Sequence, residues 1–393
     1  NEFVVVSKAK ELLKGLAFSP KTQLVSLANS VGKFLASPVL APMNVPSFDN
    51  SGMDGYAFAW EDLGESRKLA QVVQAGSNPD FTLEKGTAVR IFTGAPVPDG
   101  ADTVVQQEWV TVVGDTVFFE LEKLVKGMHV RKAGSQCQEG EIILNSGTQV
   151  TPGTIGLLAS LGIEQVEVFR SPNVSIILTG DEIIEIGQAL QPGQIYNANG
   201  PALIAYLSQM GITEVKVLKV KDEKSEVTRV IGEALESSDV VLLTGGISVG
   251  DYDFVKESLA ENGVEQLFYK VKQKPGKPIF AGVKGEKMVF ALPGNPASVL
   301  TCFIQYVKPF LLRLLGNPDA WSAPSYFPIV SDFSKKAPLT FFLKAKLENN
   351  RVTILPAQES FNLLSFGIAD GVVEIPQELE HIESGSLVAF YPW

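Results

Sequence analysis

The spacing of apolar residues divides the chain into regions with different predicted structures. Helical spacing in residues 4–13 and 25–35 predicts that the chain opens with two helices. Residues 69–150 instead show short alternating runs separated by glycine and proline, which predict a small β domain. A helix is expected at Pro152–Leu161, because proline is favoured in the first turn of a helix and glycine, here Gly162, is favoured directly after its last residue.

After residue 172 the pattern becomes an alternation of apolar strands and amphipathic helices. The expected strands are 174–178, 214–220, 240–243 and 266–271 with a hairpin of 279–283 and 288–292, and the expected helices are 200–210, 223–236, 254–261 and 297–315. Such alternation predicts a doubly wound, mostly parallel α/β domain with helices on both faces of the sheet. Residues 326–393 are strand-rich and predict a small C-terminal β domain, so the whole is a multidomain α/β plus all-β protein.

Composition narrows the functional classes. A net charge of −11 argues against nucleic-acid binding, which needs a basic surface. We expect a cytoplasmic protein, because no apolar run approaches the roughly 20 residues of a membrane span and the N-terminus lacks signal-peptide order. Two cysteines and two histidines leave little scope for thiolate or imidazole chemistry, so carboxylates, lysines and hydroxyl groups must form any site.

Three glycine- or proline-rich turns each follow an apolar strand. They are TGDE (179–182), TGGISVGDYD (244–253) and LPGNPAS (292–298). The carboxyl ends of parallel strands meet at one edge of a sheet, where open α/β sheets bind ligands. Glycines let backbone N–H groups approach an anion, and carboxylates nearby indicate a metal ion between protein and phosphate. The turn 244–253 alone is equally typical of an ordinary βα connection, with Asp251 or Asp253 capping a helix.

A lysine-rich stretch, YKVKQKPGKP (269–278), adds a basic patch to this acidic protein. If the strand continues through it, Lys270, Lys272 and Lys274 share one face, as in a solvated edge strand. Lys274 and Lys277 also stand on a proline-stiffened turn, which favours binding of an oxyanion. Both interpretations stay open on the sequence.

Polar loops elsewhere offer further candidates. These are VPSFDNSGMDGYA (45–57), IFTGAPVPDGAD (91–102) and RKAGSQCQEGE (131–141), and in the last domain the polar side chains of Lys344, Ser360 and Ser365. Each loop is as compatible with a simple barrel corner as with a site, because connecting loops carry both roles.

Taken together, the motifs FDNSGMDGYA, FTGAPVPDGAD, LTGDE, TGGISVGDYD, KPGKP and ALPGNPAS resemble the MoeA-type molybdopterin molybdenumtransferases, whose eukaryotic relative is the gephyrin E domain. Their order and separations match over nearly the whole chain. The resemblance implies four domains: a helical linking domain (1–46 plus 146–170), a β-rich lid (47–145), an α/β molybdopterin-binding domain (171–316) and a C-terminal β domain (317–393). It also implies a homodimer that contacts other cofactor-synthesis proteins.

The resemblance further implies insertion of molybdate into adenylylated molybdopterin, with Mg²⁺ present and AMP released. Asp54, Thr93, Glu182 and Asp253 would then be catalytic, and Glu182 and Asp253 would bind the metal. The residues implied in substrate binding are Asp222, Gly245, Gly246, Ser248, Lys274, Lys277, Pro278, Pro293, Pro296, Ser298, Lys344 and Ser360.

Three positions depart from the family pattern. Gln136 replaces a lid carboxylate, Lys344 stands where arginine is usual, and Asn197 stands where aspartate is common. An alternative therefore stays open, in which the protein keeps the fold and binds a pterin or scaffolds partners without catalysis. A generic dinucleotide-binding enzyme is disfavoured, because no G-x-G-x-x-G opens a βα unit.

Overall fold

A six-stranded sheet organises the largest lobe of the computed structural model, which describes residues 3–247 and 254–393. The sheet order is β16 (Val215–Val220), β13 (Val174–Thr179), β17 (Val240–Thr244), β21 (Lys287–Leu292), β20 (Phe280–Lys284) and β18 (Glu265–Tyr269). Strands β16, β13, β17 and β21 are parallel neighbours, and β20 forms an antiparallel hairpin with β21. This sheet is the predicted mostly parallel one, and its helices are α1 (Val6–Lys14), α3 (Asn199–Gln209), α4 (Lys224–Ser237), α5 (Val255–Glu261), α6 (Pro296–Cys302) and α7 (Lys308–Leu314).

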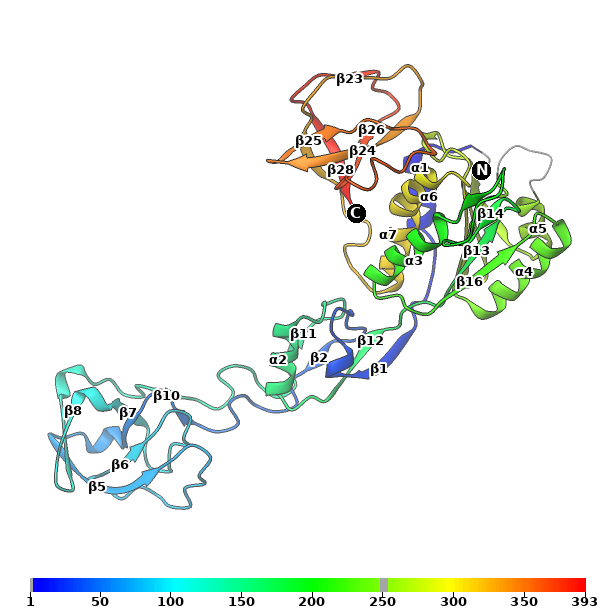
Figure 1. The fold of residues 1–393 in the computed structure, drawn as a ribbon. Helices are drawn as coiled ribbons and strands as arrows, with labels where there is room; N and C mark the ends of the chain where they lie inside the picture. The colour runs from blue at the N-terminus through cyan, green and yellow to red at the C-terminus, as the bar shows by residue number, and fades with distance from the viewer. Residues whose placement is uncertain (1–2, 248–253) are drawn as a thin grey trace.

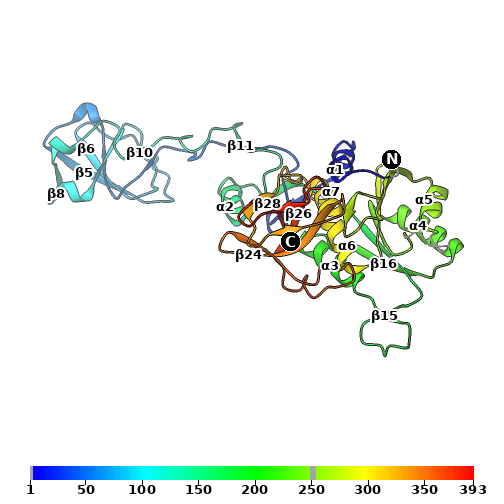
Figure 2. The same cartoon turned by 90° about the horizontal axis from the view of Figure 1, so that it is seen from above.

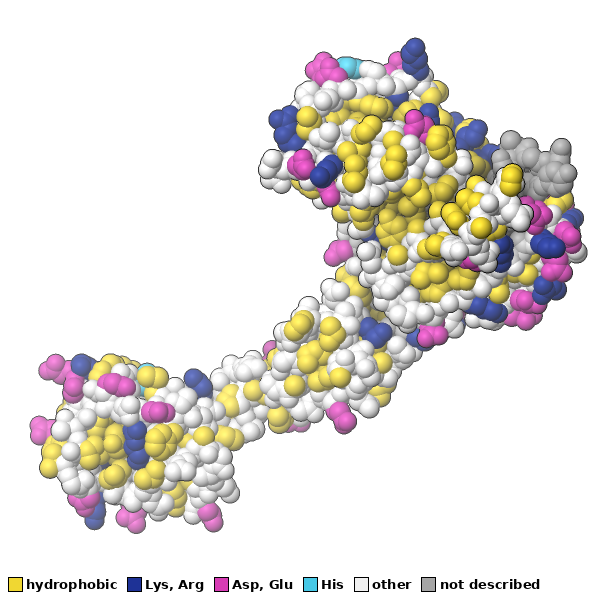
Figure 3. Space-filling view, in the orientation of Figure 1, with side chains coloured by type: hydrophobic (Ala, Val, Ile, Leu, Met, Phe, Trp, Pro, Cys, Tyr) yellow, Lys and Arg dark blue, Asp and Glu magenta, His cyan; other side chains and the backbone are white. Residues whose placement is uncertain are grey.

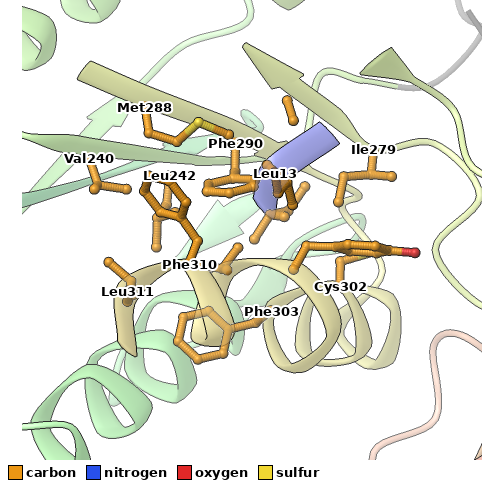
Figure 4. Packing of buried hydrophobic residues seen from close by; sticks show 14 of the residues in the cluster. Leu13, Val240, Leu242, Ile279, Met288, Phe290, Cys302, Phe303, Phe310 and Leu311 are labelled. Atoms are coloured by element: carbon orange, nitrogen blue, oxygen red, sulfur yellow. The ribbon is translucent and has the colours of Figure 1, made fainter. Parts of the chain in front are cut away.

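Helices cover both faces of this sheet because its central strands are apolar on both faces. Leu242 of β17 packs in a cluster with residues of α1, α3, α6 and α7, whereas Leu243 packs with residues of α4 and α5. Figure 4 shows the first cluster, where Phe290 of the sheet meets Phe310 and Leu13 from the helices. The hydrophobic core therefore fixes the orientation of every strand that ends at the site described below.

The long helix expected at 297–315 is present but interrupted. A π-helical turn, Phe303–Val307, separates α6 from α7. Pro309 explains the interruption, because in a regular α-helix its ring would clash with the carbonyl of Gln305, four residues earlier. The segment Pro296–Leu314 is long and apolar enough to cross a membrane by composition, but 78% of it is buried inside the protein, as in a core helix.

A small lobe, here called the linking lobe, is built from two separated segments of chain. In it β1 (Thr22–Ser26) pairs with β12 (Gln165–Phe169), β2 (Val39–Leu40) pairs with β11 (Ile142–Leu144), and α2 (Pro152–Ser160) packs beside them. The predicted helix at 25–35 is wrong, because pairing with β12 draws its first residues into a strand. The linking lobe therefore combines the helix α2 with these short strands, and α1 packs into the core of the α/β lobe instead.

Two β lobes complete the molecule, as predicted. The distal lobe has the strand order β7 (Thr103–Gln106), β4 (Gly55–Phe58), β6 (Thr87–Ile91), β5 (Ser66–Val73), β9 (Thr116–Phe119) and β8 (Val110–Val113). The C-terminal lobe has the order β19 (Gln273–Lys274), β24 (Thr340–Glu348), β26 (Gly371–Ile375), β28 (Leu387–Pro392) and β22 (Ser325–Pro328), and β25 (Arg351–Ile354) pairs with β24.

The lobes are arranged along an elongated molecule. The distal lobe lies at one end, the linking lobe lies in the middle, and the α/β and C-terminal lobes lie together at the other end (Figures 1 and 2). Asp239 ties the linking lobe to the sheet, because its carboxylate accepts hydrogen bonds from Lys21 and Arg170 at 2.7 Å each. Any site that uses residues of both ends cannot close within one chain in this arrangement.

Candidate functional site

The carboxyl ends of neighbouring parallel strands bring the three sequence turns together. The turn 179–182 follows β13, the turn beginning at Thr244 follows β17, and the turn 292–298 follows β21, in adjacent positions of the sheet. The N–H of Gly245 donates to the carbonyl of Leu292 at 3.3 Å, which joins the second turn to the third. The predicted convergence of these motifs at one sheet edge is therefore seen in the structure.

These turns surround a cavity of about 680 Å³. Seven of the residues implied by the resemblance line it: Glu182, Asp222, Gly245, Gly246, Pro278, Pro293 and Pro296. Phe361 and Leu363 of the C-terminal lobe line it as well, so the cavity lies between two lobes. Figure 3 shows hydrophobic side chains gathered in the concave surface between these lobes.

Gly245 and Gly180 are required by close approach at this edge. A Cβ on Gly245 would lie 2.6 Å from the hydroxyl and 2.7 Å from the carbonyl oxygen of Thr179, and its φ is +89°. A Cβ on Gly180 would lie 2.9 Å from both carboxylate oxygens of Glu182. The first glycine lets two turns touch, and the second lets the Glu182 carboxylate lie against the backbone.

Carboxylates gather on one side of the cavity. Burial raises the pKa of Asp222 above its usual range, and repulsion from Glu182 and Asp181 raises it further. The backbone N–H of Asp181 also hydrogen-bonds this carboxylate, which opposes the shift. Clustered acidic oxygens with raised proton affinity suit a hard divalent cation, because the cation would relieve the repulsion.

The structure adds Thr244, Asn199 and Asn295 to the cavity; Thr244 and Asn295 belong to turns named above, but none of the three was among the predicted site residues. Two buried side-chain oxygens, the Thr244 hydroxyl and the Asn199 amide Oδ1, have no hydrogen-bond partner within the described part of the chain. Asn199 donates instead through its amide nitrogen to the carbonyl of Gly294 at 2.9 Å. The sequence did offer a signal for Asn199, because it begins α3 two residues after Asn197. Asn197 is the position noted above as a departure from the family pattern.

The lysine turn lies beside the cavity rather than in its wall. Strand β18 ends at Tyr269 and Lys270 has φ +62°, so the expected continuous strand with three lysines on one face is wrong. Gln273 holds the turn, because its buried amide donates to the carbonyls of Pro275 at 3.0 Å and Gly276 at 3.2 Å. Lys274 and Lys277 are exposed on this turn, and Pro278 reaches the cavity.

Ser298 and Ser360 are not among the residues that line the cavity. Ser298 is 3% exposed in the first turns of α6. Ser360 joins the C-terminal lobe to this edge, since its hydroxyl accepts from Asn295 at 3.0 Å and its carbonyl accepts from Ala297 at 3.1 Å. The segment 357–363, here called the capping loop, is thereby fixed over the cavity.

Lys344 is not a ligand-facing side chain. It is 2% exposed, and its ammonium donates to the carbonyls of Ala357 at 2.5 Å, Glu359 at 3.5 Å and Asn362 at 2.9 Å. Burial lowers the pKa of Lys344 below its usual value. The implied direct contact with substrate is therefore contradicted by this geometry, because every one of these bonds goes to the backbone of the capping loop.

Asp54 and Thr93 form a pair in the distal lobe, away from the cavity of the same chain (Figure 1). The backbone N–H and the hydroxyl of Thr93 each donate to Asp54 Oδ1 at 2.8 Å, and these bonds lower the pKa of Asp54. Gln136 is exposed, and its backbone N–H donates to the carbonyl of Val45 at 2.8 Å. Ser248 and Asp253 lie outside the described residues, so the structure leaves their predicted roles as predictions.

The fold and the cavity define a class of protein: a multidomain α/β protein with an acidic, glycine-lined ligand cavity at the carboxyl edge of its sheet, capped by a β lobe. Three family models match the chain along its length. They are the MoeA N-terminal region (domain I and II) over residues 4–162, a probable molybdopterin binding domain over 175–313, and the MoeA C-terminal region (domain IV) over 328–393.

Individual relatives agree with the family models. The molybdopterin molybdenumtransferase of Haemophilus influenzae is 32% identical over 98% of this chain and 96% of its own length. The protein of the same name from Nostoc sp. is 38% identical over 76% of this chain and 71% of its own length. A crystal structure of the molybdopterin biosynthesis MoeA protein from Pyrococcus horikoshii superposes with a TM-score of 0.87 at 32% identity, covering 100% of this chain and 99% of the other. The chain belongs to the MoeA family.

Proposed function

We propose that this protein is a molybdopterin molybdenumtransferase of molybdenum cofactor biosynthesis, which inserts molybdate into adenylylated molybdopterin and releases AMP. The relatives reported above carry that name, and this chain matches them over most of their length. The observation that carries the proposal is the cavity at the sheet edge, which glycine turns and carboxylates line and beside which the lysine turn lies. Its volume of about 680 Å³ lies within the ~300–1,000 Å³ typical of ligand sites.

The proposed chemistry has two parts, binding of the anionic substrates and hydrolysis of the phosphoanhydride. Backbone groups of the glycine turns and the exposed Lys274 and Lys277 suit molybdate and the phosphate groups, all of which are anionic. Hydrolysis of the phosphoanhydride adds a water oxygen to phosphorus, breaks the bridging P–O bond and gives AMP, with one proton released. This step needs no covalent protein nucleophile, and Cys302 is unsuited to be one, because burial raises its thiol pKa far above the usual range.

Mg²⁺ fits the residues present. No group of three or more His, Cys, Asp or Glu side chains suited to a metal occurs within residues 3–247 and 254–393. Mg²⁺ does not need such a group, since it is usually held by one or two carboxylates together with substrate phosphates. Glu182 and Asp222 would hold it, together with Asp253 as the sequence predicts. When bound, the ion neutralises charge on the phosphate oxygens.

A homodimer would complete the site. Asp54 and Thr93 lie in the distal lobe, at the opposite end of the molecule from the cavity of their own chain (Figure 1). Exposed apolar side chains also occur here: Ile195, Tyr196 and Phe361 line the cavity, and Ile186 and Leu190 of the loop 183–196 and Leu364, next to the capping loop, are exposed as well. A second copy that covers this surface and presents its distal lobe accounts for both features. We extend the proposal to a cytoplasmic protein that meets other cofactor-synthesis proteins.

The exposed Gln136 favours one alternative, a non-catalytic homologue that binds pterin or scaffolds partners, because a carboxylate is usual in that lid position. Comparing Glu182→Gln with Glu185→Gln separates the two functions. Glu185 is exposed in the loop 183–196, three residues after Glu182, and does not line the cavity. Release of AMP from adenylylated molybdopterin by wild type and Glu185→Gln, but not by Glu182→Gln, supports the transferase. Tight pterin binding without AMP release by any of the three proteins supports the alternative.

Mixed dimers test whether the site is shared. Asp54→Ala damages the distal lobe and Glu182→Gln damages the cavity, so each homodimer is expected to be inactive. In an equilibrated equal mixture half of the dimers are mixed and carry one intact site of two, giving about a quarter of wild-type activity. A mixture as inactive as its components would show that each site is built from one chain.

A further inference from the structure

A second cavity, of about 400 Å³, lies where α1, α7 and the C-terminal strand β28 meet. It shares no lining residue with the cavity described above. Three lysines line it, Lys10, Lys14 and Lys308, against one carboxylate, Asp319. Its charge is therefore opposite to that of the protein as a whole.

Unpartnered polar atoms mark this second cavity as a built site. Gln305 is 1% exposed and lines the cavity, yet neither its amide oxygen nor its amide nitrogen has a hydrogen-bond partner within the described residues. The indole N–H of Trp321, in the same lining, is also buried and unpartnered. Buried polar groups are nearly always satisfied, so three such atoms in one cavity indicate a ligand that satisfies them.

The helix geometry explains why Gln305 is available. It lies at the centre of the π-helical turn 303–307, whose widened backbone accommodates Pro309. Such turns occur often at functional sites. A glutamine kept unsatisfied at this position costs stability, which a leucine of similar size would not.

Two aromatic side chains, Trp321 and Tyr391, line the cavity, and each has a lysine beside it. The Lys14 ammonium lies 5.6 Å from the ring centroid of Trp321, and that of Lys10 lies 4.6 Å from the ring centroid of Tyr391. Lys10 also lies 3.7 Å from the Glu374 carboxylate, so part of its charge is balanced. Lys308 has no hydrogen bond or ion pair to any described side chain and is free to meet an anion.

We propose that this cavity binds a planar heterocycle that carries an anionic group and presents a hydrogen-bond donor next to an acceptor. A carboxamide with both atoms free pairs with such an edge, as glutamine does with adenine. The ring stacks against Trp321, and Lys308 and Lys14 bind the anionic group. Purine nucleotides and pterins bearing a phosphate or carboxylate share this chemistry.

Titration of full-length protein with three probes tests the proposal, with tryptophan fluorescence as the readout. The probes are AMP, pterin-6-carboxylate and inorganic phosphate, and Trp321→Phe identifies the part of the signal that comes from this cavity. We expect AMP or pterin-6-carboxylate to change the Trp321 signal, with affinity at least about tenfold weaker in Gln305→Leu and in Lys308→Gln. Comparison of the two ring probes tells the purine source from the pterin source. Glu182→Gln serves as the control, because it alters the other cavity and should leave this titration unchanged.

Stability of Gln305→Leu gives an independent readout. If the amide is unsatisfied until ligand binds, the variant unfolds at a higher temperature than wild type in the absence of ligand. Three results overturn the proposal: no Trp321-dependent signal with either ring probe, phosphate binding as tightly as both ring probes, or a Gln305→Leu protein that is less stable and binds normally. The last would make Gln305 a structural residue satisfied by water.

Discussion

Replacing Lys344 by methionine should release the capping loop without removing any group that lines the cavity. The ammonium donates to the three loop carbonyls of Ala357, Glu359 and Asn362 and is almost completely buried. Hydrogen bonds that involve a charged group contribute about 1.5–3 kcal/mol each, but the substitution also removes the cost of burying a charge. We expect a net loss of about 1–3 kcal/mol in the free energy of unfolding.

The same substitution should weaken ligand binding, because Phe361 and Leu363 of the loop line the cavity. Lys346→Met is the matched control, since Lys346 lies two residues further along β24 and pairs on the surface with Glu348 at 3.0 Å. Its free energy of unfolding should change by less than about 0.5 kcal/mol.

Urea unfolding and equilibrium binding of adenylylated molybdopterin measure the two effects. The expected pattern is lower stability and weaker binding in Lys344→Met, with neither effect in Lys346→Met. Weaker binding with unchanged stability and unchanged loop protection in hydrogen exchange would refute the reasoning, because the lysine would then act on substrate directly.

Three further predictions follow from the site and its supports. Gly245→Ala should lower the free energy of unfolding by about 3 kcal/mol, because it adds a clash with Thr179 to an unfavourable φ. Gly187→Ala, with φ +92° and open space, should lower it by about 1 kcal/mol. Equal losses in urea unfolding would contradict the close contact between Gly245 and Thr179. Glu182→Gln should lower the pKa of Asp222, since one source of repulsion is removed, and a carboxyl titration by NMR that finds no change would exclude that coupling. Although burial opposes it, hydrogen bonds from lysine, backbone and arginine lower the pKa of Asp239 below 3.8; its stabilisation is therefore complete above pH 3.8 and lost as the pH falls through the lower folded value. Asp239→Asn should thus destabilise the protein by about 1 kcal/mol at pH 7 and by little at pH 2, and an equal effect at both would refute this role.

The α/β lobe was predictable because local and long-range signals agree there. Its strands are continuous apolar runs, and parallel strands place their following turns at one edge, so Glu182 and Gly245 could be grouped from the sequence, whereas Asp222 was implied by the resemblance. Residues 25–35 show the opposite case. Their apolar spacing fits a helix, but pairing with β12, which lies more than a hundred residues later in the chain, decides the structure.

Side-chain environment was the part of the site that the sequence did not reveal. Lys344 has the charge expected of an anion ligand, and only the fold shows that backbone carbonyls surround it. Thr244 opens the motif TGGISVGDYD and Asn199 belongs to no quoted motif, but the unpartnered side-chain oxygens of both become visible only once neighbouring turns are in place. Asp54 belongs to a predicted motif, but its distance from the cavity is a property of how the lobes are joined (Figure 1).

Single-turnover release of AMP tests the central claim most directly. Purified protein would be given adenylylated molybdopterin and Mg²⁺, with and without molybdate, and AMP and pterin-bound molybdenum would be measured together. The proposed transferase predicts AMP release that depends on molybdate and matches the molybdenum inserted. Pterin bound tightly with no AMP released under either condition would contradict it and leave a binding protein of the same fold.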